Sequence, residues 1–230
     1  MNLLAASTQF YQPRGLRSSR QVDSKTLISM LRAAFRPADI EKDELFWKMK
    51  KWERANHRYP LLKRWRDLDP LGVLSDQRYW ESDLHAILKT LEPGAMLAVF
   101  KMDLDNFKAV NDKYGHTVGD EAIRLYSRTV LDIIGAVGEV YRRGGDEIIV
   151  LAPGLSEGGA RELAEKTRGA IEARFRSWAR TGGLDYRPTA SIGLTLAAAD
   201  RPASEILRLV DDAQRRAKEL GKNRVVVMNE

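Results

Sequence analysis

Two β-rich runs on either side of a pair of glycines constrain the fold of this chain more than any other feature. Residues 147–152 (EIIVLA) are rich in aliphatic and β-branched side chains, residues 139–143 (EVYRR) contain the strand formers Val140 and Tyr141, and Gly144, Gly145 and Asp146 lie between the two runs. Glycine adopts positive φ at no steric cost, and a glycine pair between two such runs is typical of a tight hairpin turn. The sequence therefore predicts an antiparallel hairpin centred on residues 144–146.

The apolar pattern around this hairpin alternates between strand and helix. It predicts strands at residues 96–103, 189–195 and 224–228, and helices at residues 119–134, 156–178 and 203–220. The order βαββαβ, followed by one more helix and strand, predicts an α/β (α+β) fold with a ferredoxin-like sheet. In such a fold we expect helices on one face of a largely antiparallel sheet and the other face free for a ligand.

The segment before this alternation has a different character. Residues 1–22 lack apolar periodicity and are expected to be a mobile basic tail, whereas residues 23–68 have helical periodicity. Trp47, Trp52 and Trp65 in that helical segment either pack against the main domain or form a dimer or partner surface. The main domain is expected to cover residues 69–230.

Composition limits the chemistry of any site. The chain has 230 residues, no cysteine and three histidines, which excludes disulfides, thiolate catalysis and zinc–thiolate sites. Any metal must therefore be held by oxygen atoms. The chain shows neither a leader sequence nor an apolar run of the ~18 residues that span a bilayer, so we expect a cytoplasmic protein without membrane contact.

Positive charge is concentrated at the N-terminus. The formal net charge is +6, and residues 1–69 hold 15 Lys or Arg against 8 Asp or Glu. Such a segment can attract nucleic acid, an acidic partner or a membrane surface, but most surface charge only solvates the protein. Nucleic-acid binding is therefore not expected.

Two acidic pairs mark the candidate site. Asp103 and Asp105 follow directly on the first predicted strand, and Asp146 and Glu147 lie at the hairpin tip. Neighbouring strands would bring the pairs to one edge of the sheet, where Mg²⁺ bound between carboxylates and substrate phosphates would offset their repulsion. A single Asp in a turn is more often a turn former or a helix cap, but two pairs at these positions favour a metal site.

Glycines and lysines near these acids suit a nucleotide. Gly144 and Gly145 carry no side chain, so a ligand can lie against the hairpin backbone. Lys108, Lys218 and Lys222 are candidate phosphate ligands. The alternative for Lys218 and Lys222 is a helix C-terminus in which basic residues offset the helix dipole.

Several separated motifs follow one another along the chain. They are DLDNFKAVND at residues 103–112, GHTVGD at 115–120, GGDEI at 144–148, SIG at 191–193 and AKELGKNR at 217–224. In these motifs and their order the chain resembles the GGDEF family of diguanylate cyclases. The resemblance covers about residues 69–230 and implies a palm-like sheet, binding of GTP, and condensation of two GTP molecules into cyclic di-GMP.

The resemblance also implies roles for individual residues. Asp103 and Asp146 would ligate two Mg²⁺ (or Mn²⁺) ions, with the backbone at Leu104 assisting. Glu147 would be a further metal ligand or the group that helps to deprotonate the attacking 3′-hydroxyl. Asp103, Asp146 and Glu147 are thus the implied catalytic residues.

The implied substrate contacts divide into base and phosphate contacts. A carboxylate can accept hydrogen bonds from guanine N1–H and N2–H₂, and adenine offers no such pair. The residues that match the guanine pair are Asn111 and Asp120; those assigned to the rest of the substrate are Asn106, Phe107, Lys108, Gly145, Lys218 and Lys222. Lysine at position 222 replaces the more usual arginine and cannot form a bidentate fork.

Apart from Lys222, the chain departs from the family pattern at three places. The family's opening motif, of the form DxLTGLxNRR, appears as DPLGVLSDQR at residues 69–78 and lacks its Thr-Gly and Asn. The final Phe of the signature is Ile148, an exchange we expect a strand to tolerate. The product-inhibition motif RxxD falls on Gly135 and Gly138, so we expect no feedback inhibition there.

The implied reaction needs a homodimer, because each bound GTP supplies its 3′-hydroxyl to the α-phosphate of the other. Either the N-terminal helices or a regulatory partner protein is expected to control that dimerisation. A different class of function is a non-catalytic GGDEF-like module that binds GTP or cyclic di-GMP. A palm-type polymerase or another nucleotidyl cyclase shares the metal acids, but Asn111 with Asp120 argues against it.

Overall fold

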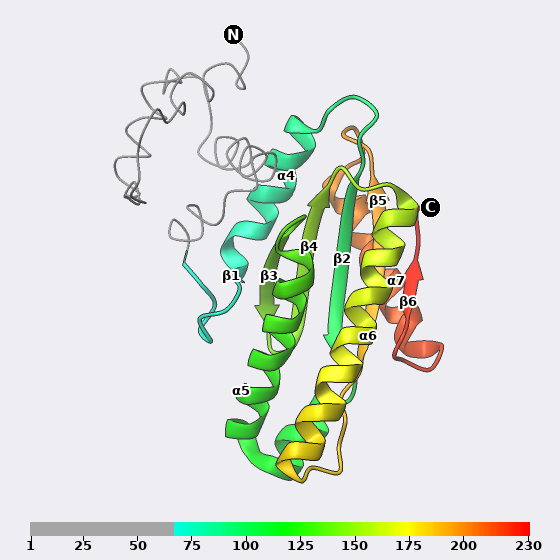
Figure 1. Cartoon of the computed structure of the whole chain (residues 1–230). Helices are drawn as coiled ribbons and strands as arrows, with labels where there is room; N and C mark the ends of the chain where they lie inside the picture. Colours follow the sequence, from blue (N-terminus) through cyan, green and yellow to red (C-terminus); the bar gives the residue numbers. More distant parts are fainter. Residues whose placement is uncertain (1–66) are drawn as a thin grey trace, which may run out of the picture. The chain divides into compact units, whose positions relative to one another are not determined.

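The computed structural model describes residues 67–230 (Figure 1). The predicted basic tail at residues 1–22 and nearly all of the predicted helical segment at residues 23–68, with its three tryptophans, lie outside the described residues. The domain boundary at residue 69 stays a prediction.

The described part of the chain forms one mixed sheet with helices. The sheet order is β1-β3-β4-β2-β5-β6. The elements in chain order are β1 (Ser75–Asp76), the 3₁₀ helix η2 (Gln77–Tyr79), α4 (Trp80–Thr90), β2 (Leu97–Leu104), α5 (Phe107–Ile134), β3 (Glu139–Gly144), β4 (Glu147–Pro153), α6 (Glu157–Gly182), β5 (Ala190–Ala197), α7 (Ala203–Glu219) and β6 (Val225–Val227).

The predicted order of elements is confirmed. Strand β2 lies between β4 and β5 and is antiparallel to both, and β3 and β4 form the predicted hairpin, with Gly144 opposite Glu147. The short strands β1 and β6 add parallel pairs at the two edges. The fold class inferred from the apolar pattern is therefore correct.

Helices α5 and α6 cover one face of the sheet. Phe100 and Met102 of β2 are fully buried in one apolar cluster with Tyr126 of α5 and Phe175 of α6. Burial of such large side chains stabilises a domain by about 1.5–3 kcal/mol each. This cluster fixes the end of β2, from which the candidate site residues project.

The opposite face is also covered, so the expectation of a face left free for a ligand is wrong. A Cβ added to Gly193 of β5 would lie 2.5 Å from the carbonyl oxygen of Val210, which shows how closely α7 packs on this face. Strand β2 explains the arrangement, because Val99 is as fully buried as Phe100 although their side chains alternate in direction. A ligand must therefore approach an end of the sheet, such as the end of β2 beside the turn between β3 and β4 (Figure 1).

Other boundaries differ from the predicted ones. Helix α5 begins at Phe107 instead of residue 119 and bends at Gly115, whose φ of 83° and ψ of 167° are not helical. Helix α4 and strand β1 had not been predicted. Among residues 67–230, no helix combines the length and the apolar character needed to cross a bilayer.

Candidate active site

The carboxylates of Asp103 and Asp146 come from neighbouring strands. Asp103 lies near the end of β2, and Asp146 lies in the turn between β3 and β4. Because Met102 pairs with Ile148 across β2 and β4, the next residue of β2 lies beside that turn. The structure thus brings the two acidic groups to one end of the sheet.

Burial and the charges of neighbouring carboxylates raise the pKa of both carboxyl groups. Burial, and then the charge of Asp103, raises the pKa of Asp146 to about 6, although Lys218 and the backbone N–H of Leu104 stabilise its anion. Burial also raises the pKa of Asp103, and its hydrogen bond with Lys218 opposes that shift. An added cation would relieve this repulsion.

Lys218 supplies one positive charge at this point. Its Nζ lies 2.8 Å from Oδ1 of Asp103, and the lysine side chain is 38% exposed. The lysine comes from the last turn of α7, which packs against β5 and β2. The predicted phosphate ligand and the predicted metal ligand are therefore in direct contact.

The donor set fits a hard divalent cation. Asp103, Asp146 and Glu147 offer carboxylate oxygens, and Leu104 offers backbone groups beside them. Mg²⁺ usually binds one or two carboxylates and completes its octahedral shell with water and substrate phosphates. Within the described residues, no group of three or more His, Cys, Asp or Glu forms a ready-made metal cluster, so the fit rests on the two repelling carboxylates.

The glycine turn leaves its backbone open. Gly144 has a φ of 148° and Gly145 a φ of 52°, and a Cβ at either position would meet no atom within 4 Å. Arg142 holds the turn, because its Nε donates to the carbonyl oxygen of Gly145 at 2.8 Å. A ligand can therefore approach a turn whose shape is already set.

Asp69, which the altered opening motif retains, has a structural role. Its buried carboxylate accepts hydrogen bonds from the backbone N–H groups of Val73 and Leu74, both at 2.9 Å, and forms an ion pair with Arg142 at 3.0 Å. Burial raises the pKa of this carboxyl, but these donors more than compensate and lower it overall. Asp69 therefore links the segment at 69–74 to the arginine that holds the glycine turn.

The start of α5 presents backbone donors. Asn106 has a left-handed φ of 57°, and its side chain makes no capping hydrogen bond with the helix. As in any helix, the first N–H groups, here at Phe107 and Lys108, point along the axis toward the N-terminus. Such a terminus favours anions. Lys108 is exposed, and the Nζ of Lys222 donates to Oδ1 of Asn106.

The structure brings the predicted guanine pair together. A Cβ at Gly119 would lie 1.9 Å from Oδ1 of Asn111, so the amide of Asn111 occupies the space that only glycine leaves at position 119. Asp120, the next residue, is exposed. The bend at Gly115 returns the chain so that the amide of Asn111 lies beside the residue that precedes Asp120.

A comparison with family models decides the assignment. Residues 66–224 match the model described as "Diguanylate cyclase, GGDEF domain". The chain belongs to the GGDEF family. The resemblance seen in the motifs is confirmed.

Curated relatives of this GGDEF domain include two diguanylate cyclases. VdcA of Vibrio cholerae is 31% identical over 158 residues, which are 69% of this chain and 46% of VdcA. DosC of Escherichia coli is 33% identical over 132 residues, which are 57% of this chain and 28% of DosC. The chain thus spans half or less of the length of these relatives.

Solved structures share the fold. The GGDEF domain of DgcB from Caulobacter crescentus, in complex with c-di-GMP, is 25% identical with a TM-score of 0.64 and covers 70% of this chain and 96% of that one. A sensory box/GGDEF family protein from the same organism is 31% identical with a TM-score of 0.59, covering 67% and 99%. SiaD of Pseudomonas aeruginosa, in complex with its activator SiaC, has a TM-score of 0.65 over 89% of this chain and 81% of its own, and at 24% identity shows the fold alone.

Asp105 has a structural part in this GGDEF domain that the sequence did not reveal. Its carboxylate is only 4% exposed and accepts hydrogen bonds from Ser191 Oγ and Thr189 Oγ1, both at 2.6 Å, and from the backbone N–H of Asn223 at 3.0 Å. With its oxygens engaged in this way, the second acid of the first pair joins β2, β5 and the loop after α7, whereas the first acid faces the candidate metal site.

Lys101 is a further charged residue at the site that sequence reasoning missed. It is 8% exposed, and its Nζ lies 2.7 Å from Oδ1 of Asp211 and 4.0 Å from Oε1 of Glu147. A polar residue within an otherwise apolar strand was the available signal, because a lysine is almost never so buried without a partner. Lys101 connects the signature glutamate of the GGDEF domain to α7.

Gly135 and Gly138 occupy tight positions. An added Cβ would lie 2.6 Å from the carbonyl oxygen of Leu131 at the first and 3.0 Å from that of Leu151 at the second. Any side chain there would need its neighbours to move. The structure therefore adds a steric reason to the chemical one for the missing arginine and aspartate.

Proposed function

We propose that this chain is a diguanylate cyclase that condenses two GTP molecules into cyclic di-GMP and two pyrophosphates. The observation that carries the proposal is the meeting of Asp103, Asp146 and Lys218 at the end of the sheet, next to the open glycine turn. The names of the curated relatives and the cyclic di-GMP bound to the DgcB domain support it. The N-terminal residues then form a regulatory or dimerisation segment, with a partner protein as one source of control.

In this proposal the protein's own residues position the substrate. Asn111 and Asp120 pair with the guanine edge, and the N–H groups at Phe107 and Lys108 bind the phosphates together with Lys218 and Lys222. Gly145 lets the nucleotide lie close to the turn. Positioning of this kind supplies most of the rate in phosphoryl-type transfers, because little covalent chemistry is left to the protein.

Asp103, Asp146, Glu147 and the backbone at Leu104 would hold two Mg²⁺ or Mn²⁺ ions. When bound, these ions would neutralise the triphosphate and lower the pKa of the attacking hydroxyl. Glu147, whose side chain is 40% exposed, either joins this ligand set or accepts the proton of the 3′-hydroxyl. In each half-reaction a new bond joins that oxygen to the α-phosphorus, and the bond to the pyrophosphate leaving group breaks.

One domain holds only half of the reacting groups. The 3′-hydroxyl of one bound GTP attacks the α-phosphate of a GTP bound to a second copy, so the active form is a homodimer. The rate per protomer should therefore rise with protein concentration until all of the protein is dimeric.

The competing proposal is a non-catalytic module that binds GTP or cyclic di-GMP. It is disfavoured because Asp103, Asp146 and Glu147 are all present at the end of the sheet. Incubating the purified chain with GTP or with ATP and Mg²⁺, and identifying the products by mass, separates the two proposals. Formation of cyclic di-GMP from GTP, with no corresponding product from ATP, supports the cyclase. GTP binding without any product supports the non-catalytic module.

A further inference from the structure

Two consecutive residues of the loop after α7 adopt left-handed backbone conformations. Lys222 has a φ of 63° and Asn223 a φ of 46°, directly after Gly221 at 112°. For a residue with a Cβ this conformation costs about 1–2 kcal/mol, somewhat less for Asn. Contacts elsewhere must therefore hold the loop in this shape.

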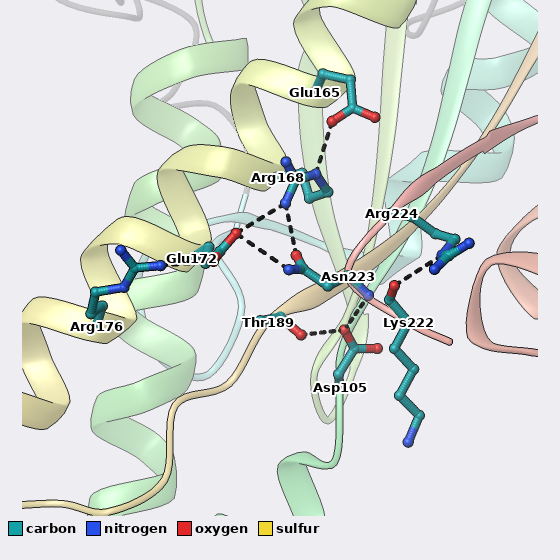
Figure 2. A network of polar contacts seen from close by, with 9 residues as sticks. All are labelled: Asp105, Glu165, Arg168, Glu172, Arg176, Thr189, Lys222, Asn223 and Arg224. Carbon is teal, nitrogen blue, oxygen red and sulfur yellow. Dashed lines mark hydrogen bonds and ion pairs between the residues drawn. The ribbon is translucent and has the colours of Figure 1, made fainter. Parts of the chain in front are cut away.

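The side chains of these two residues point in different directions. Figure 2 shows the side chain of Asn223 turned toward α6, whereas that of Lys222 extends away from it. The ammonium group of Lys222 then reaches Oδ1 of Asn106 at the start of α5. The backbone conformation of this loop thus determines the position of the Lys222 ammonium group, the candidate phosphate ligand.

Asn223 is held at both ends of its amide by α6. Its Oδ1 accepts a hydrogen bond from Nη1 of Arg168 at 2.9 Å, and its Nδ2 donates to Oε2 of Glu172 at 3.3 Å. Arg168 and Glu172 are themselves paired at 3.1 Å, one turn apart on the helix (Figure 2). The guanidinium and the carboxylate therefore fix the orientation of the amide. A flipped amide would place its NH₂ group against the guanidinium, so that two donors would face each other.

The backbone of Asn223 is held as well. Its N–H donates to Oδ2 of the buried Asp105 at 3.0 Å, and Thr189 donates to the same oxygen (Figure 2). Asp105 directly precedes Asn106, the residue that Lys222 contacts. The turn at residues 105–107, the loop at residues 221–223 (the lysine loop) and α6 are therefore joined by one set of charge-assisted hydrogen bonds, which are stronger than neutral ones.

We propose that Arg168 and Glu172 on α6 are positioning residues for the triphosphate site, acting through Asn223 on Lys222. The inference rests on the proposed function, because it takes Lys222 as a ligand of the GTP phosphates. Neither α6 residue touches the substrate. Their effect is to keep the lysine loop in its left-handed shape, so that its ammonium group lies beside the turn at residues 105–107 before the nucleotide arrives.

The test is a double-mutant cycle on nucleotide binding. Calorimetry with a non-hydrolysable GTP analogue and Mg²⁺ is carried out on the wild type, Arg168→Met, Lys222→Met and the double variant. Arg168→Met should raise the Kd by about fivefold to tenfold, the net loss expected for one ordinary hydrogen bond, because Arg168 acts on the phosphates only indirectly. The double variant should bind no more weakly than Lys222→Met alone, because Arg168 acts through that lysine.

Arg161→Met is the matched control, because Arg161 lies on the same helix and, among residues 67–230, forms an ion pair with Glu157 alone, at 3.6 Å and in an exposed position. It should leave the Kd unchanged, and the melting temperature of each variant shows whether it is folded. Equal affinity of folded Arg168→Met and Arg161→Met, or additive losses in the double variant, would overturn the positioning role while leaving the cyclase proposal intact. A wild type that binds no GTP analogue would overturn both.

Discussion

The ammonium group of Lys218 lies 2.8 Å from Oδ1 of Asp103, so a candidate phosphate ligand neutralises a candidate metal ligand. The nearby carboxyl of Asp146 has a pKa raised to about 6 by burial and by the charge of Asp103. Without a bound metal ion, Lys218 balances only part of the negative charge of Asp103 and Asp146 at the end of the sheet. The site is therefore suited to binding further cations, at the expense of the stability of the protein without them.

Asp146→Asn should stabilise the metal-free protein above pH ~6. The folded-state pKa of about 6 exceeds the unfolded value of about 3.9. Between these values the folded state binds more protons, so the free energy of unfolding falls as pH rises, and the full cost is present above the upper value. The amide carries no charge, and after discounting for partial exposure we expect a gain of about 1–2 kcal/mol.

Urea unfolding in a chelator at pH ~4 and ~8 measures this gain, which should appear only at the higher pH. Asp185→Asn is the control of opposite sign, because hydrogen bonds from Lys113 and Tyr114 lower the pKa of Asp185 to about 2. That variant should not be stabilised at either pH. Equal effects of Asp146→Asn at both pH values would contradict the account.

Asp211→Asn should destabilise the domain more than Lys101→Met. The lysine is buried, whereas the side chain of Asp211 is 49% exposed and can return to water. Removing the aspartate leaves a buried ammonium without its nearest partner, at a cost of about 1–3 kcal/mol, but removing the lysine leaves a solvated carboxylate. Denaturant midpoints of the two variants measure the difference. The reverse order would show that Asp211 is not the main partner of Lys101.

Asp120→Ala should weaken the discrimination of GTP from ATP. The guanine N1–H and N2–H₂ donors lose their acceptor, and we expect the ratio of affinities to fall by about tenfold or more. Glu121→Ala removes a neighbouring exposed carboxylate and should leave that ratio unchanged. Competition binding of both nucleotides provides the measurement, and unchanged selectivity in Asp120→Ala would mean that the base is bound elsewhere.

Cyclic di-GMP should not inhibit this protein at the family's usual allosteric position. Gly135 and Gly138 offer no guanidinium or carboxylate, so a product bound there would gain little free energy. Initial rates against added product, at two GTP concentrations, should show only weak competition that excess GTP relieves. Strong inhibition that persists at high GTP would show that another surface binds the product.

The local parts of the fold were predictable from the sequence. The hairpin at residues 139–152 followed from two glycines between runs that contain strand-forming residues, because a turn depends on adjacent residues. Helix α5 was predicted only from residue 119, because Gly115 interrupts the periodicity where the helix bends. Helix α4 starts after Tyr79 without a side-chain cap, so the usual start signal was missing.

The polar contacts behind the site were not predictable. Asp105 and Asn223 are 118 positions apart, and no periodicity indicates that the second acid of a pair holds a distant loop. The face expected to be free is covered because β2 is apolar on both sides, which a search for alternation alone does not detect. The acidic pairs, the glycine turn and the candidate lysines were identified from the sequence pattern. The resemblance added the guanine pair and the individual roles, which stay predictions.

The most direct test compares the wild type with Glu147→Gln, measuring cyclic di-GMP formation by mass and GTP binding by calorimetry on the same samples. The amide keeps the size of the side chain but removes its charge. We expect cyclic di-GMP from the wild type, loss of product in Glu147→Gln with GTP binding largely kept, and normal activity in the control Glu157→Gln. Normal synthesis by Glu147→Gln, or no cyclic di-GMP from a wild type that binds GTP, would contradict the proposed cyclase activity.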